Sequence, residues 1–76
     1  MEQEKKAGPA RLFDVLKAEN KLKNDAALAR AIGMPAAVIC NMRAGRVEIS
    51  APAILRIIEN FGMPLPRIRR LLKGDE

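Results

Sequence analysis

Apolar residues recur at intervals of three and four along most of the chain, which is the spacing of one face of an α-helix. Five such segments lie near residues 9–19, 25–32, 36–44, 51–61 and 65–73. Four glycines follow helical runs, where glycine readily takes the left-handed conformation that ends a helix: Gly33, Gly45, Gly62 and Gly74. The pattern predicts an all-α domain over residues 9–74, preceded by a flexible arm at residues 1–8.

Individual positions add expectations about the core and the helix ends. The first helix carries an apolar stripe that includes Val15, and Asn20 is expected to end it in a left-handed turn. Asn24 is expected to cap the second helix, with Asp25 against its positive end. In the fourth helix the residues expected to be buried are Ile54, Ile58 and Phe61, flanked by Leu55 and Ile57. In the fifth helix one face is shared by Leu65, Ile68, Leu71 and Leu72. Residues 47–50 alternate in polarity like a strand but have no partner strand, so we interpret them as a loop.

The amino-acid composition argues against an enzyme. The chain has no His, Thr, Tyr or Trp, and its lone Ser50 and Cys40 have no histidine to activate them. The acidic residues are scattered and lack the spacing of a metal-binding loop, so we expect neither a metal nor a cofactor. One cysteine cannot form an internal disulfide, which favours a reducing, cytoplasmic compartment. No apolar run is long enough for a membrane span.

The charge balance favours a nucleic-acid partner. Lys and Arg number 14 against 9 Asp and Glu, which gives a formal net charge of +5. A basic domain gains affinity for nucleic acid from the release of counterions, although basic helix faces also serve simply to keep a small protein soluble. Readers of single-stranded RNA usually stack bases on aromatic rings, and both phenylalanines, Phe13 and Phe61, are expected in the core. Duplex DNA is therefore the favoured partner.

The second and third segments carry a more specific arrangement of small and apolar residues. Gly33 permits a tight turn between them, and Ala29 is small where the next helix must come close. The register that carries the resemblance is Leu28, Ala29, Ile32, Gly33, Met34, Ile39 and Met42, followed by Gly45. In this register the sequence resembles the phage Cro and repressor family, also called Xre-like helix-turn-helix proteins, over roughly residues 10–73. The resemblance implies a compact five-helix, lambda-repressor-like DNA-binding domain.

The resemblance also implies which residues would touch DNA. Residues 36–44 would form the recognition helix in the major groove. Its outward face would read bases through Ala36, Ala37, Cys40 and Asn41, and the DNA backbone would be contacted by Lys23, Asn24, Asp25, Arg43 and Arg46. The sequence departs from the family in its small reading-face side chains, in Asp25 where Gln is frequent, and in Pro35 where a capping Ser is common. Cys40 is interpreted either as a small semi-buried filler or as a point of redox control.

These features predict a bacterial or phage-encoded transcriptional regulator, acting as a repressor on duplex DNA. One such domain reads only half of a palindromic site, so a homodimer is expected. The dimer contact would come from Ile57, Leu65, Ile68 and Leu72, each of which could equally be an ordinary core residue. The alternative function is a protein-interaction module, such as an antitoxin or an adaptor, whose alanine-rich face docks a partner protein.

Overall fold

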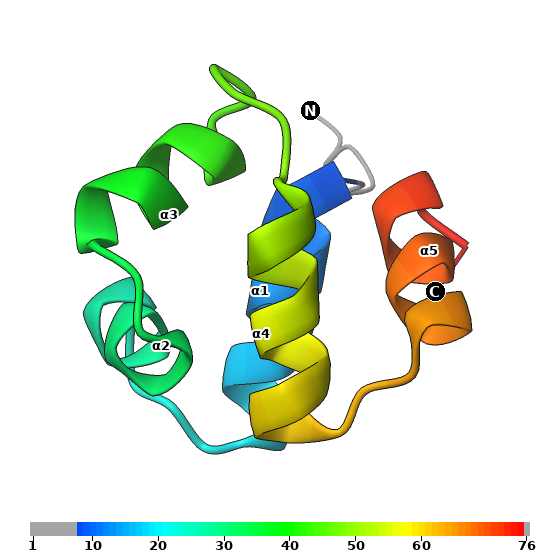
Figure 1. The fold of residues 1–76 in the computed structure, drawn as a ribbon, viewed down its shortest axis with the longest axis horizontal. Helices are drawn as coiled ribbons and strands as arrows, with labels where there is room; N and C mark the ends of the chain where they lie inside the picture. Colours follow the sequence, from blue (N-terminus) through cyan, green and yellow to red (C-terminus); the bar gives the residue numbers. More distant parts are fainter. Residues whose placement is uncertain (1–7, 76) are drawn as a thin grey trace, which may run out of the picture.

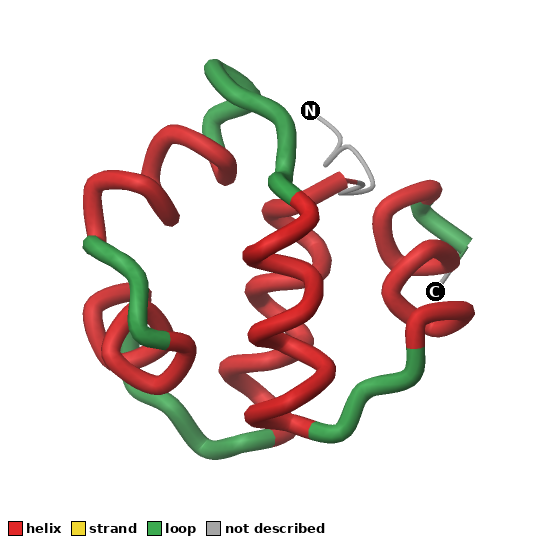
Figure 2. The backbone as a smooth tube through the Cα atoms, viewed as in Figure 1, coloured by secondary structure: helices red, strands yellow, loops and turns green. Residues whose placement is uncertain are grey.

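The computed structural model describes residues 8–75, which form five α-helices (Figure 1). They are α1 (Gly8–Glu19), α2 (Asp25–Ile32), α3 (Ala36–Arg43), α4 (Ala51–Phe61) and α5 (Leu65–Lys73). The five predicted segments are confirmed to within one residue at each end. Over the described range every other residue lies in a loop or turn, including residues 47–50 (Figure 2). Gly8 belongs to α1, and the rest of the predicted arm, residues 1–7, lies outside the described residues.

Helices α1 and α4 lie in the middle of the fold, with α2 and α3 on one side and α5 on the other (Figure 1). Helix α1 contacts α2, α3 and α5, and α4 contacts α2 and α5. The fully buried large side chains come from all five helices: Leu12, Phe13 and Leu16, Leu28 and Ile32, Ile39, Ile57, and Ile68 and Leu71. One apolar core therefore joins the helices, as expected for a chain whose single cysteine cannot form an internal disulfide.

The start of α2 folds as the sequence predicts, and the end of α1 does not. Asn24 Oδ1 accepts a hydrogen bond of 2.8 Å from the backbone N–H of Ala27, which confirms it as the cap of α2. The left-handed residue after α1 is Lys21 (φ 57°), so the prediction for Asn20 is wrong. The backbone N–H of Asn20 still donates to the Leu16 carbonyl at 3.1 Å, which continues the helical turn and moves the reversal one residue later.

The rotation of α4 about its axis differs from the prediction. Ala53 and Ile57 are fully buried, Ile54, Ile58 and Phe61 pack at the edge of the core, and Leu55 is 54% exposed. Apolar residues surround most of this helix, so their spacing alone does not determine which stripe faces inward. Because Ile57 and Ile68 are enclosed by the core, the prediction that they form a dimer contact is wrong. The other two predicted contacts, Leu65 and Leu72, remain at the surface.

The turn between α2 and α3 is closed by Gly33 and by an arginine from α4. Gly33 has φ 71°, and the N–H of Met34 donates to the Ala29 carbonyl at 2.9 Å. Arg56 Nη1 donates to the carbonyls of Ile32 and Gly33 at 3.1 and 3.3 Å. A Cβ atom on Gly33 would lie 2.7 Å from that same nitrogen. The turn therefore depends on glycine both for its conformation and for the approach of Arg56.

Substitution of Gly33 tests this dependence. We expect Gly33→Ala to lower the free energy of unfolding by more than Gly45→Ala, which serves as the matched control. Both alanines would take positive φ, at a cost of about 1–2 kcal/mol each, but only the one at position 33 would also displace Arg56. Urea unfolding followed by circular dichroism measures the difference, and equal losses would show that the Arg56 contact contributes nothing.

Candidate nucleic-acid interface

Helix α3 has one buried side and one exposed side. Ile39 and Met42 are buried against the core, and Val38 is half-buried beside them. The exposed side consists of Ala36, Ala37, Cys40 and Ala44. This division is the one predicted from the sequence except at Asn41, which is expected on the outer face but is half-buried, and it leaves α3 with a narrow outer face of small side chains. Cys40 is exposed, so the structure does not support its interpretation as a semi-buried filler.

Asn41 lies at the border between the two sides and is tied to the following loop. Its side-chain oxygen accepts a hydrogen bond of 3.2 Å from Arg46 Nη1. Its backbone carbonyl accepts from the N–H groups of Arg46 (2.9 Å) and Val47 (3.4 Å). The loop after α3 therefore folds back on the end of the helix, and this brings together two of the residues predicted to contact DNA.

The C-terminal end of α3 is fastened by a group of four charged side chains, Asp14, Lys17, Asp25 and Arg43, which we call the charge cluster. Arg43 donates from Nε and Nη2 to the two carboxylate oxygens of Asp25 at 2.8 and 2.9 Å. Its Nη1 lies 3.0 Å from Asp14 Oδ1, and its guanidinium carbon lies 5.9 Å from the centre of the Phe13 ring. Lys17 Nζ is 2.9 Å from Asp25 Oδ1 and 3.8 Å from Asp14 Oδ1. The cluster joins α3 to both α1 and α2.

The electrostatics of the charge cluster favour the ionised state of two of its members, Asp25 and Arg43. Burial disfavours the charged form of Asp25, but the hydrogen bonds from Arg43 and Lys17 together outweigh it and lower the pKa of Asp25. Burial likewise acts against charged Arg43, and the hydrogen bonds to Asp25 and Asp14 outweigh it, which raises the pKa of Arg43. Both groups are therefore charged at neutral pH.

The charge cluster gives Asp25 and Arg43 a role that differs from the predicted DNA-backbone contact. Each is the other's ion-pair partner, and the Arg43 side chain is 24% exposed. Sequence reasoning missed the pair because its members are 18 residues apart and lie on different helices. The local signal was the i, i+3 spacing of Asp14 and Lys17 on α1, which indicates a charged edge but not its partner.

The other residues predicted to contact the DNA backbone lie next to α2 and α3, and they differ in exposure and in hydrogen bonding. Lys23 is exposed in the loop before α2, and Arg46 is exposed in the loop after α3. The side-chain oxygen of Asn24 is engaged as the cap of α2. Arg30, on α2, is also exposed. Lys23, Arg30 and Arg46 therefore offer positive charge on the elements next to α3.

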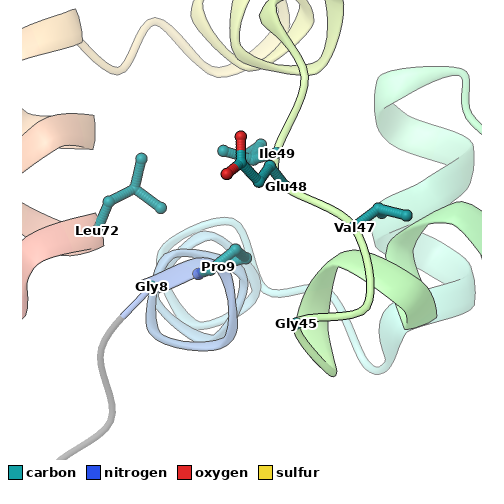
Figure 3. Close-up of a pocket in the computed structure, with 7 residues that line it drawn as sticks. All are labelled: Gly8, Pro9, Gly45, Val47, Glu48, Ile49 and Leu72. Carbon is teal, nitrogen blue, oxygen red and sulfur yellow. The ribbon is translucent and has the colours of Figure 1, made fainter.

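A hollow of about 470 Å³ lies between the start of α1, the loop after α3 and the end of α5 (Figure 3). Its described lining residues are Gly8, Pro9, Gly45, Val47, Glu48, Ile49 and Leu72. Of these seven, Glu48 is the one ionisable residue, so the lining offers no nucleophile beside a base. Within residues 8–75 no three metal-ligating side chains come together. No helix in that range is both long and apolar enough to cross a bilayer.

Comparison of the chain with protein-family models, with curated proteins and with solved structures found no significant match.

The charge cluster predicts an acid-sensitive stability. Asp25 has a pKa below its ordinary value of 3.8, so its pairing contributes fully above that pH and is lost as the pH falls through the lower, folded-state pKa. We expect Asp25→Asn to be less stable than the parent at pH 7 and to lose less stability between about pH 4 and pH 2. Urea unfolding at a series of pH values measures this change. Glu59→Gln, which removes an exposed carboxylate from α4, is the control, and an identical pH dependence in the parent and Asp25→Asn would contradict the assignment.

Proposed function

We propose that this chain is a duplex-DNA-binding protein that places the outer face of α3 in the major groove. The observation that carries the proposal is that α3 is held on its inner side by the core and the charge cluster while its outer face carries only short side chains. An α-helix fits the width of the major groove, and short side chains permit its backbone to approach the base edges closely. The net charge of +5 supplies attraction to the phosphates.

The connection between α2 and α3 supports the helix-turn-helix interpretation. Two eight-residue helices are joined by Gly33, Met34 and Pro35, and they pack on each other. In helix-turn-helix proteins the second helix enters the major groove while the first crosses the DNA backbone. On this proposal α3 is the recognition helix, and Lys23 beside α2 faces the phosphates.

The proposed contacts divide into base readers and phosphate ligands. The methyl groups of Ala36 and Ala37 would pack on thymine methyl groups, and Asn41 would pair with adenine by exchanging its bond to Arg46. Arg46 released in this way would bind a phosphate. With so few hydrogen-bonding side chains on the reading face, part of the sequence preference would come from DNA shape.

Repression is the regulatory outcome we propose, because a protein bound at an operator blocks access of polymerase. A single domain covers one half-site, so a palindromic operator would require two copies about 34 Å apart. Homodimerisation remains a prediction from the sequence, and the burial of Ile57 and Ile68 removes half of the surface predicted for it.

Introduction of a negative charge on the outer face of α3 tests the proposed interface. We expect Ala37→Glu to weaken binding to duplex DNA by at least about tenfold, because a carboxylate in the major groove would be repelled by the negatively charged phosphates. Ala18→Glu makes the same chemical change at an exposed position on α1 and should weaken binding much less. Fluorescence anisotropy with a duplex selected from a random library measures both. Equal effects of the two variants would overturn the interface, and undiminished binding by Ala37→Glu would favour the protein-interaction alternative.

The salt dependence of binding separates the two proposed classes of contact. Arg46→Ala should weaken binding to all sequences and lower the slope of log K against log salt by about one, because one phosphate contact is lost. Asn41→Ala should reduce discrimination at one base pair by about 1–3 kcal/mol and leave the salt slope unchanged. The same anisotropy titrations at several salt concentrations measure both quantities. An unchanged slope in Arg46→Ala would remove this residue from the interface.

A further inference from the structure

An apolar groove runs between α4 and α5, separate from α3. It has a volume of about 460 Å³ and is lined by Ala51, Ile54, Leu55, Ile58, Leu65, Ile68, Arg69 and Leu72. We call it the α4–α5 groove. Leu55 is 54% exposed and Leu65 is 36% exposed, so two of the three large apolar side chains that the described surface exposes belong to it. Such a concentration of exposed apolar side chains in one groove is typical of interaction sites.

The spacing of the lining residues fits one kind of occupant. On each helix the lining positions are i, i+3, i+4 and i+7, so each wall is a stripe that runs about 10 Å along a helix axis. An amphipathic helix places its own apolar residues at the same spacing and fills such a groove along two turns. The groove therefore fits the apolar stripe of a third helix.

The charge along the α5 wall determines which helix fits. Arg69 belongs to the lining, and Lys73 follows it one turn later on the same flank of α5. Both side chains are exposed, and α5 carries Arg67, Arg69, Arg70 and Lys73 with no acidic residue. A helix seated between Leu55 and Leu65 would bring its polar flank against this positive wall, which favours a carboxylate-rich flank.

We infer that the α4–α5 groove binds an amphipathic helix of a partner protein, one with an apolar stripe and acidic residues along the flank that meets α5. A second copy of this chain fits less well, because a two-fold contact pairs a patch with itself and would bring the two basic α5 flanks together. Helices α3 and α5 lie on opposite sides of α4 (Figure 1), so a partner helix seated between α4 and α5 leaves the outer face of α3 open.

Two synthetic peptides test the inference. The first is a helical peptide with leucines at i, i+3, i+4 and i+7 flanked by glutamates, and the second has lysines in place of the glutamates. Each is titrated into the full ¹⁵N-labelled chain while amide shifts are recorded. We expect the glutamate peptide to shift amides of residues 51–58 and 65–73 and to bind about tenfold more tightly than the lysine peptide. Leu55→Glu should weaken binding of the glutamate peptide by about tenfold or more.

A charge exchange makes the result specific to the α5 wall. The double variant Arg69→Glu, Lys73→Glu should reverse the preference and bind the lysine peptide more tightly. Lys21→Glu combined with Lys23→Glu alters the net charge equally, at exposed positions before α2, and should retain the preference for glutamate. Circular dichroism verifies that each variant is folded.

Equal affinity for the two peptides would overturn the inference. Amide shifts that lie outside the groove, or the absence of shifts at millimolar peptide, would also overturn it. So would sedimentation of a homodimer that Leu55→Glu dissociates. The last result would assign the groove to a second copy of the chain.

Discussion

The orientation of the C-terminal end of α3 depends on Arg43, which binds carboxylates on both α1 and α2. An isolated helix of eight residues is not stable in water, so α3 is held by its tertiary contacts. Burial of Ile39 and Met42 supplies the larger share, about 1.5–3 kcal/mol for each side chain. Partly exposed ion pairs supply less, about 1 kcal/mol or below, but they are directional. The apolar contacts therefore keep α3 on the core, and the charge cluster determines how its end is oriented.

Local signals predicted most of the fold. Capping by Asn24, the turn at Gly33 and the buried side of α3 each depend on residues close in sequence, and the structure confirms them. The rotation of α4 could not be predicted, because its apolar residues form more than one possible inward stripe and only packing selects Ala53 and Ile57. The roles of Asp25 and Arg43 could not be predicted either, because their pairing requires the relative placement of three helices.

The two proposed surfaces differ in shape and composition, and the helices α3 and α5 that carry them lie on opposite sides of α4 (Figure 1). The outer face of α3 is narrow, with Lys23, Arg30 and Arg46 on the neighbouring elements, which suits a polyanion with grooves. The α4–α5 groove is apolar along its length and basic on one wall, which suits a helix. This separation would allow one small domain to bind DNA and a partner protein at the same time. The charge cluster would hold the end of α3 in place whether or not the α4–α5 groove is occupied.

DNA binding through α3 is tested most directly by the map of amide shifts in the ¹⁵N-labelled chain on addition of a mixed-sequence duplex, first at low and then at moderate salt. We expect salt-sensitive shifts concentrated in residues 36–46 and around Asn24 and Asp25 at the start of α2. Shifts confined to α5 would mean attraction of DNA to basic charge without use of α3. That result, or the absence of shifts throughout the chain, would contradict the proposal.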